Sequence, residues 1–241
     1  MHTESETPPT ENPPNVLAGI LTRIGTLAIF FVLIAAVLLL AAGRLKWTWA
    51  WVYLGICLVS VSINGTIMLR TSPETIAERG RPQETKDWDK VVSGLLAVAV
   101  YFALPLVAGL DVRFGGAPDL DVAWHVAGAV VLAVGLGLTA WAMIANALFS
   151  TAVRIQSERG HTVCSTGPYR FVRHPGYVGF ILQSISVPLL LGSLWALIPG
   201  ITAAVLVIVR TSLEDRTLQA ELPGYRDYVQ RVRCRLVPGI W

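Results

Sequence analysis

Residues 167–177 read Gly-Pro-Tyr-Arg-Phe-Val-Arg-His-Pro-Gly-Tyr, a block of turn-forming, cationic and aromatic residues. The block lies between two segments that are apolar enough to cross a lipid bilayer. A charged stretch, Arg210-Thr-Ser-Leu-Glu-Asp215, follows the second of those segments. Because polar clusters at a membrane boundary are unusual without a use, this arrangement predicts a membrane-embedded protein whose chemistry takes place at one face of the bilayer.

Composition places the chain among polytopic membrane proteins. Of its 241 residues, 54% are hydrophobic and 15% are charged, a balance outside the range of soluble globular domains. We therefore expect one integral-membrane domain over residues 16–241, with its polar motif region in residues 150–241. Residues 1–15 are polar and rich in Pro, Thr and Glu, which predicts a disordered tail.

The spacing of apolar residues predicts an all-α fold. A fifth apolar region, Tyr177–Val209, follows four shorter ones; it is too long for one ordinary span and contains Pro188, Pro199 and a turn-like Leu191-Gly-Ser193. We interpret it as a hairpin of two helices, which makes about six crossings, whereas one kinked helix would make five. The four earlier runs each reach the ~20 residues that span a bilayer as a helix: Val16–Ala42, Trp49–Leu69, Val91–Leu110 and Val122–Phe149.

The placement of positive charge predicts an orientation. In a six-span arrangement, sixteen of the nineteen Lys and Arg residues fall on the side of the loop formed by residues 150–176, the motif loop. The positive-inside rule then puts both termini and that loop in the cytoplasm. The other side carries only Arg44, Lys46 and Arg113.

Two features of the spans have structural interpretations. Trp47, Trp49 and Trp51 cluster at the boundary opposite the motif loop, where an interfacial aromatic belt is expected. Gly135-Leu-Gly137 in the fourth span is expected to permit close helix packing. The three cysteines are far apart and show no metal-ligand spacing, so we expect no metal site. We also expect no nucleic-acid partner.

The loop before Tyr177 can form a cradle for a charged small molecule. Gly167-Pro-Tyr169 favours a turn, and His174 is biased to an extended backbone because a proline follows it. Pro175 suits the first turn of the next helix, whose free amides would attract a carboxylate or a phosphate. Tyr169, His174 and Tyr177 would then surround this helix start.

The charged stretch after the last apolar run forms the second part of the motif region. Arg210 and Glu214 lie four residues apart and would share one face of a continuing helix. A snorkelling arginine paired with the glutamate is the structural interpretation, and a ligand site is the functional one. Further on, an apolar stripe among charged residues predicts a surface-lying amphipathic helix that covers the loop: Leu213, Leu218, Leu222, Tyr225, Tyr228 and Val232.

The C-terminal half resembles the isoprenylcysteine carboxyl methyltransferase family of membrane methyltransferases. The resemblance implies an enzyme that uses S-adenosyl-L-methionine, held beneath the loop and the C-terminal tail, and that methylates the carboxyl group of a lipophilic, isoprenylcysteine-like substrate. It rests on elements that occur in the family's order: Gly167-Pro-Tyr169, Arg173-His-Pro-Gly-Tyr177-Val-Gly179, Arg210-x-x-x-Glu214-Asp215-x-x-Leu218, and Gly224-Tyr-x-x-Tyr228 before Arg235-Leu-Val-Pro238.

The family's functional residues carry over position by position. Its substrate-side arginine falls on Arg210. Its upstream glutamine aligns without gaps to Arg154, and Gln156, two residues on, is our candidate for that contact. The remaining cofactor contacts fall on His161, Thr162, Val163, Cys164, Tyr169, His174, Pro175, Gly176, Tyr177 and Glu214.

The chemistry of methyl transfer agrees with these assignments. The transfer needs alignment, and a carboxylate acceptor is already ionised near neutral pH, so no general base is required. Arg210 would hold that acceptor as a counter-charge, and His174 would be the base if the acceptor were an amine or a thiol. Glu214 suits the ammonium or a ribose hydroxyl of the cofactor, and Tyr169 and Tyr177 offer aromatic surface to its adenine or sulfonium.

Three other interpretations stay open. A related enzyme would methylate an amine or a thiol on a phospholipid or small molecule. A sterol-type reductase would bind NADPH, although the chain has no dinucleotide signature. A scaffold or transporter would place polar residues inside the first four spans, which offer few. The sequence leaves the acceptor, the host membrane and the oligomeric state open.

Overall fold

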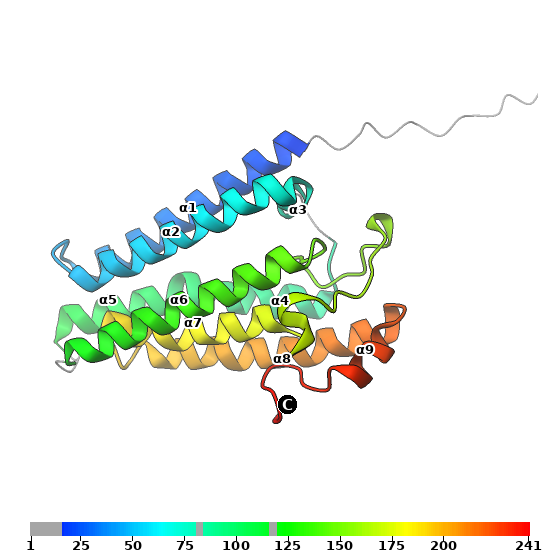
Figure 1. Ribbon diagram of the computed structural model, residues 1–241. Helices are drawn as coiled ribbons and strands as arrows, with labels where there is room; N and C mark the ends of the chain where they lie inside the picture. The colour runs from blue at the N-terminus through cyan, green and yellow to red at the C-terminus, as the bar shows by residue number, and fades with distance from the viewer. Residues whose placement is uncertain (1–15, 81–83, 116–119) are drawn as a thin grey trace, which may run out of the picture.

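Each long apolar run forms a helix. The computed structural model describes residues 16–80, 84–115 and 120–241, so the predicted tail lies outside the described residues. Within these ranges the fold is all-α, with no β-strand. Figure 1 shows the long helices side by side in one bundle, with α3, α9 and the loop after α6 gathered at its right-hand end. The first six helical elements are α1 (Val16–Ala42), α2 (Thr48–Thr71), α3 (Pro73–Arg79), α4 (Asp87–Ala97), the π-helical stretch η1 (Val98–Ala103) and α5 (Leu104–Phe114).

The last apolar region forms two helices, as the hairpin interpretation predicts. After α6 (Val122–Ala145) comes α7 (Pro175–Leu191), which is capped by Gly192, whose φ of +76° suits glycine. Helix α8 then runs from Leu197 to Glu221. The alternative interpretation, one kinked helix over this region, is therefore wrong. In the described part of the chain, five helices are long and apolar enough to cross a membrane, with α4, η1 and α5 forming one of them. The 17 residues of α7 are at the lower limit of about 17–25 for a sixth span.

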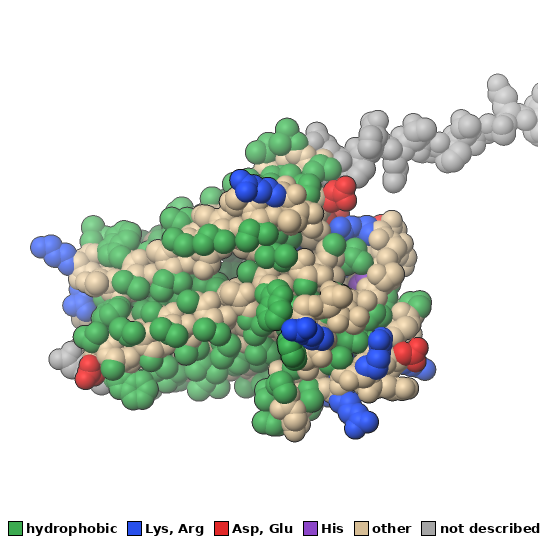
Figure 2. All heavy atoms as spheres, in the orientation of Figure 1, with side chains coloured by type: hydrophobic (Ala, Val, Ile, Leu, Met, Phe, Trp, Pro, Cys, Tyr) green, Lys and Arg blue, Asp and Glu red, His purple; other side chains and the backbone are tan. Residues whose placement is uncertain are grey.

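The outer surface of the bundle is that of a polytopic membrane protein. Figure 2 shows hydrophobic side chains over the middle of the visible face and charged side chains at its two ends, with more of them at the end near α9. Large aliphatic side chains such as Ile29 and Leu40 are exposed, and an apolar surface of this extent needs lipid around it. Which end faces the cytoplasm stays a prediction, which labelling with a membrane-impermeant reagent would test.

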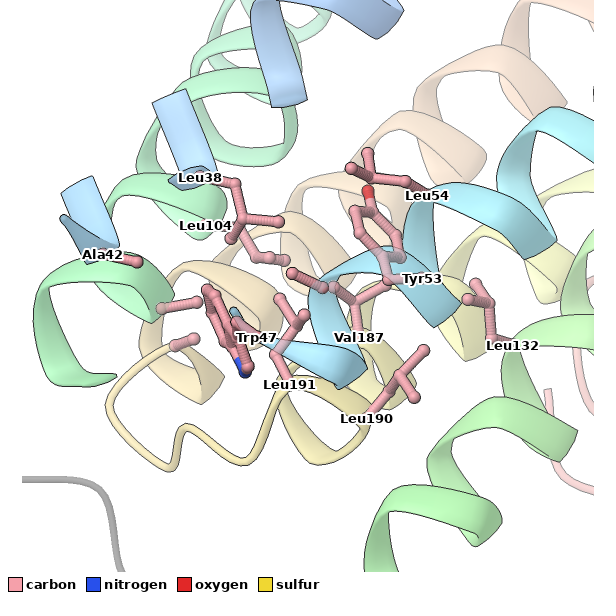
Figure 3. Packing of buried hydrophobic residues seen from close by; sticks show 13 residues of the cluster. Leu38, Ala42, Trp47, Tyr53, Leu54, Leu104, Leu132, Val187, Leu190 and Leu191 are labelled. Carbon is pink, nitrogen blue, oxygen red and sulfur yellow. The ribbon is translucent and has the colours of Figure 1, made fainter. Parts of the chain in front are cut away.

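The main apolar core lies toward the end of the bundle opposite the motif loop. It joins residues of α1, α2, α5, α6 and α7, with Leu104, Val187 and Leu191 near its centre (Figure 3). Trp47 is only 6% exposed and belongs to this core, so its assignment to an interfacial belt is wrong. A ring of this size contributes a large apolar area to the core when it is buried.

Helices α6 and α7 approach closely at two glycines. A Cβ atom added to Gly135 would lie 2.8 Å from Gly179 O, and one added to Gly179 would lie 2.3 Å from Thr139 Oγ1. A Cβ added to Gly137 would meet nothing within 4 Å. The prediction of close packing is thus confirmed for Gly135 and wrong for Gly137. This contact fixes the first half of α7 against α6.

We expect Gly135→Val to lower the free energy of unfolding by about 1–3 kcal/mol, because the added methyl groups must displace the backbone of Gly179. Gly137→Val is the matched control: it faces open space, so it should change stability by no more than about 0.5 kcal/mol. Thermal unfolding in detergent measures both variants. An equal loss of stability in both variants would show that the β-branched side chain, and not the contact between α6 and α7, lowers the free energy of unfolding.

Candidate functional site

A cavity of about 450 Å³ lies where the loop after α6 meets α7 and α8. Its volume is in the range of about 300–1,000 Å³ that is usual for small-molecule sites. Pro175 does not line it and is instead buried at the first position of α7. The other residues predicted from the sequence all line this one cavity: Gln156, His161, Thr162, Val163, Cys164, Tyr169, His174, Gly176, Tyr177, Arg210 and Glu214.

Gln156 organises the loop. Its side-chain Nε2 donates to Leu148 O at 2.8 Å, and its Oε1 accepts from Arg159 Nη1 at 2.6 Å. Its backbone N donates to His161 Nδ1 at 3.2 Å. Because the side-chain amide is engaged on both atoms within the loop, Gln156 shapes this wall of the cavity more than it offers free donors to a ligand.

Arg154, the residue to which the family's glutamine aligns without gaps, also lines the cavity. Its Nη2 donates to Glu78 at 2.8 Å and its Nη1 to Glu158 at 2.6 Å. Its Nε is buried and has no hydrogen-bond partner among the residues that the structure describes. A buried donor without a partner is costly, so Arg154 stands beside Gln156 as a candidate for this contact.

His161 is held as a neutral imidazole. Burial lowers the pKa of His161, and the positive charge of Arg154 lowers it further, against a smaller opposite effect of Glu214. Because Nδ1 accepts the hydrogen bond from Gln156 N, the ring proton is assigned to Nε2. At neutral pH the His161 side chain therefore offers the cavity a neutral N–H donor.

Tyr177 connects the motif loop to α8. Its hydroxyl donates a hydrogen bond to Glu214 Oε2, across two adjacent helices. The ring of His174 stacks on the Tyr177 ring, with centroids 5.7 Å apart and planes 12° apart. The guanidinium carbon of Arg210 lies 5.6 Å from the centre of the same ring, within cation–π distance. The Tyr177 ring is thus a fixed aromatic surface in the cavity wall.

Arg210 pairs with Asp89 of α4 and not with Glu214, so the structural interpretation of an Arg210–Glu214 salt bridge is wrong. Nε donates to Asp89 Oδ1 at 2.7 Å and Nη2 to Asp89 Oδ2 at 3.1 Å, while Nη2 also donates to Thr151 O at 2.8 Å. This two-point pairing fixes the plane of the guanidinium. It leaves Nη1 for another acceptor in the cavity.

Asp89, the partner of Arg210, was not predicted from the sequence. It is 1% exposed and also accepts a hydrogen bond from Val153 N at 2.9 Å, so it anchors the loop as well as the arginine. The available signal was a carboxylate two residues before a long apolar run, which in a membrane protein marks a partner or a site.

Asp215 joins the motif loop to the C-terminal tail. Its side chain is 0% exposed, and a buried carboxylate needs several donors to be stable. His174 Nε2 lies 3.3 Å from its Oδ1, so this nitrogen is occupied in positioning and is less available as a base. The donors to the carboxylate are Arg173 Nε and Nη2 at 2.8 and 3.0 Å, Arg235 Nε at 2.9 Å, Gln219 Nε2 at 2.9 Å and Tyr225 OH at 3.0 Å.

Backbone hydrogen bonds reinforce this connection. Arg173 N donates to Cys234 O at 3.0 Å, and His174 N donates to Arg235 O at 2.9 Å. Arg173 also donates through Nη1 to the carbonyls of Val232 and Arg233. The tail is therefore attached to the segment that precedes α7 by both side chains and main chain.

An apolar cluster completes the cover over the loop. Tyr225 and Tyr228 of α9 (Tyr225–Arg231) pack with Leu222 against Ile155 and Val163 of the loop. Burial raises the pKa of both tyrosines, so their hydroxyls stay protonated donors. The predicted cover by the C-terminal tail is thus confirmed. The separate helix is shorter than expected, because α8 continues to Glu221 and carries the first part of the apolar stripe.

The start of α7 leaves one backbone donor for a ligand. Tyr177 N and Val178 N donate to His174 O at 3.1 and 3.3 Å, and Pro175 has no N–H. Among the described residues no acceptor is found for the Gly176 amide, and Gly176 lines the cavity. The anion site predicted at this helix start therefore has one backbone donor, the Gly176 N–H.

Comparison with known proteins agrees with the resemblance seen in the sequence. Residues 124–220 match the model of the Isoprenylcysteine carboxyl methyltransferase (ICMT) family. Two relatives from Oryza sativa, subspecies indica and japonica, each bear the name "Probable protein-S-isoprenylcysteine O-methyltransferase" and are 32% identical to this chain over 77 residues. That alignment covers 31% of this chain and 40% of each relative. The resemblance to this family is thus confirmed over the matched stretch.

The matched range does not contain the whole site. It includes the motif loop, Arg210 and Asp215, whereas Asp89 precedes it and Tyr225 and Arg235 follow it. The structure therefore adds Asp89 to the residues of the resemblance, and it shows that Tyr225 and Arg235, which the resemblance already includes, bind Asp215.

Proposed function

We propose that this chain is a membrane methyltransferase that uses S-adenosyl-L-methionine to methylate the carboxyl group of a lipophilic, isoprenylcysteine-like acceptor. The family match supports the reaction class, because residues 124–220 contain both the motif loop and the charged stretch of α8. The names of the two relatives support the type of acceptor. We propose further that the site faces the cytoplasm, on the side where the positive charges gather.

The observation that carries this proposal is the meeting of opposite charges in one cavity. Glu214 and Arg210 line the same space, one turn apart on α8, and Tyr177 contacts both. An ammonium-bearing cofactor and a carboxylate acceptor therefore each find a counter-charge within one cavity of about 450 Å³. A reaction that only needs two reactants aligned requires little more from the protein.

The residues present fit S-adenosyl-L-methionine. When bound, this cofactor supplies a methyl group activated by a sulfonium sulfur. Glu214 Oε2 takes the Tyr177 hydroxyl, which leaves Oε1 for an ammonium or a ribose hydroxyl. The Gly176 amide suits a carboxylate, and the rings of Tyr169 and Tyr177 offer aromatic surface. His161, Thr162, Val163 and Cys164 line the same cavity.

Arg210 would bind the acceptor. Its Nη1 is the donor left for a carboxylate after Nε and Nη2 are taken by Asp89. The negative charge of Asp89 also limits the positive field at Arg210, so that the acceptor is oriented without being over-stabilised as a nucleophile. Leu96 and Phe180 line the same cavity and offer apolar contact to a lipophilic chain.

Titration of the protein in nanodiscs with S-adenosylhomocysteine tests the cofactor assignment. We expect saturable one-site binding by the natural sequence and a Kd raised about 10- to 100-fold by Glu214→Gln, because a hydrogen bond to a charged group contributes about 1.5–3 kcal/mol. Glu221→Gln is the matched control, since Glu221 lies on the same helix and pairs with exposed Lys86 outside the cavity. Unchanged affinity in folded Glu214→Gln would remove Glu214 from the cofactor site.

The same titration decides between the open interpretations. Binding of NADPH in place of S-adenosylhomocysteine would identify a reductase, and binding of neither would favour a scaffold. If S-adenosylhomocysteine binds, transfer of a radiolabelled methyl group to a prenylcysteine analogue is expected. Transfer to an amine or thiol lipid instead would keep the cofactor assignment and overturn the acceptor assignment.

A further inference from the structure

Two arginines line the cavity from elements that the motif region does not include. Arg23 comes from α1 and Arg79 from the end of α3. Tyr101, which also lines the cavity, belongs to η1. A π-helical stretch inside a helix is frequent at functional sites. This side of the cavity has no role in the cofactor and acceptor contacts assigned above.

The packing of α3 on α1 brings the two arginines together. A Cβ atom added to Gly80, the residue after Arg79, would lie 2.0 Å from Gly19 O and 3.0 Å from Arg23 N. Backbones this close require glycine at position 80, and they place the end of α3 directly against the first two turns of α1. Figure 1 shows α3 at this end of α1.

Arg79 is buried among neutral partners. It is 9% exposed, its Nε and Nη2 donate to Phe149 O at 3.1 and 2.8 Å, and its guanidinium lies over the Phe149 ring at 5.0 Å. Burial and, to a lesser extent, the charge of Arg23 together lower the pKa of Arg79 to about 10, against a smaller opposite effect of Tyr169. Both guanidinium groups line the same cavity, so two like charges share this space.

Neither arginine has a carboxylate partner in the described residues. Arg23 makes no hydrogen bond or ion pair there at all, although it lines the cavity. The other arginines of the cavity differ in this respect: Arg154 pairs with Glu78, Arg173 with Asp215 and Arg210 with Asp89.

We propose that Arg23 and Arg79 form an anion-binding subsite on the α1–α3 side of the cavity, which takes the phosphate or carboxylate group of a membrane-borne amphiphile. Two guanidinium groups that face one space attract an anion strongly where water is scarce, and their planar donors suit both oxyanions. The exposed side chains of Leu21 and Ile24 flank Arg23 on α1, so an apolar chain of the same ligand has lipid-facing surface beside it. The subsite does not depend on methyl transfer.

The test is a titration of detergent-purified protein with two anionic amphiphiles, a short-chain phosphatidic acid and a prenylcysteine carboxylate analogue. The methyl ester of that analogue and inorganic phosphate serve as comparison ligands. We expect at least one anionic amphiphile to bind at least 10-fold more tightly than both comparison ligands. Which of the two binds identifies the source of the anion. Equal binding of the ester, or binding of inorganic phosphate alone, would overturn the proposal.

Variants locate the binding. Arg23→Gln should weaken binding of the anionic amphiphile at least 10-fold and raise the Tm of the ligand-free protein, because it removes repulsion and no hydrogen bond. Arg79→Lys keeps the charge while shortening the reach, and should weaken binding to a smaller extent. Arg70→Gln is the matched control, since Arg70 is exposed at the same end of the bundle and does not line the cavity. Binding unchanged by Arg23→Gln, or reduced equally by Arg70→Gln, would overturn the subsite.

A parallel titration with S-adenosylhomocysteine separates this inference from the proposed function. Arg23→Gln should bind S-adenosylhomocysteine as the natural sequence does. If the natural sequence fails to bind S-adenosylhomocysteine but binds the anionic amphiphile through Arg23, the proposed function is wrong and the subsite stands.

Discussion

Asp215→Asn should lower the free energy of unfolding by about 3–5 kcal/mol, a fall in Tm of roughly 6–20 °C for a chain of this size. The carboxylate is fully buried, and its loss leaves Arg173 and Arg235 without a counter-charge. Because these arginines attach the tail to the segment before α7, binding of S-adenosylhomocysteine should weaken as well. Thermal unfolding in detergent and calorimetric titration measure the two effects.

Asp227→Asn is the control for the loss of a carboxylate near the tail. Asp227 is exposed on α9, so its replacement should change the free energy of unfolding by less than about 1 kcal/mol. If Asp215→Asn unfolds at the temperature of the natural sequence, the apolar cluster around Tyr228 holds the tail by itself. The role given to Asp215 would then be wrong.

Arg210→Lys should slow methyl transfer by about 10²–10³-fold, while the Kd of S-adenosylhomocysteine changes less than about threefold. A lysine ammonium cannot form two parallel hydrogen bonds to Asp89 and also present a fixed N–H to the acceptor. This expected result depends on the proposal that Arg210 binds the carboxylate of the acceptor. Single-turnover rates with a prenylcysteine analogue, measured beside calorimetric affinity, separate the rate from cofactor binding.

Two further variants control this experiment. Arg216→Lys changes an exposed arginine of the same helix and should leave both the rate and the affinity unchanged. Asp89→Asn should reproduce part of the rate loss, because it frees the guanidinium of Arg210 from its two-point pairing. A loss of S-adenosylhomocysteine binding in Arg210→Lys as large as the loss of rate would move Arg210 to the cofactor side of the cavity.

The course of the chain through the membrane was predictable because it depends on local properties. The first apolar run and α1 have the same limits, Val16–Ala42, since a helix of sufficient length and apolarity is the stable form of such a segment in lipid. The turn at Leu191-Gly-Ser193 was predictable for a similar reason, because Gly192 adopts the positive φ that ends α7. Residue chemistry within a few positions decides both features.

The part of the candidate cavity that the motif region lines was also predictable, but only through the motif. The loop residues and the charged stretch of α8 occur in a known order, and the structure places them around one cavity. Spacing along α8 indicated that Arg210 and Glu214 share a face, and both do line this cavity. The same spacing gave the wrong partner for Arg210, because a shared face does not determine which neighbouring helix supplies a charge.

The sequence by itself determined which segments are helices, where the last hairpin turns and which motif residues belong together, since these follow from hydropathy, turn chemistry and order along the chain. Only the tertiary structure decided the pairs: Arg210 with Asp89, 121 positions away, and Arg173 and Arg235 with Asp215. Such pairs depend on the rotation and depth of each helix in the bundle. The rotation and depth of a helix are set by its packing against its neighbours, for example where Gly135 contacts Gly179. Such contacts between helices do not produce a periodic pattern in the sequence.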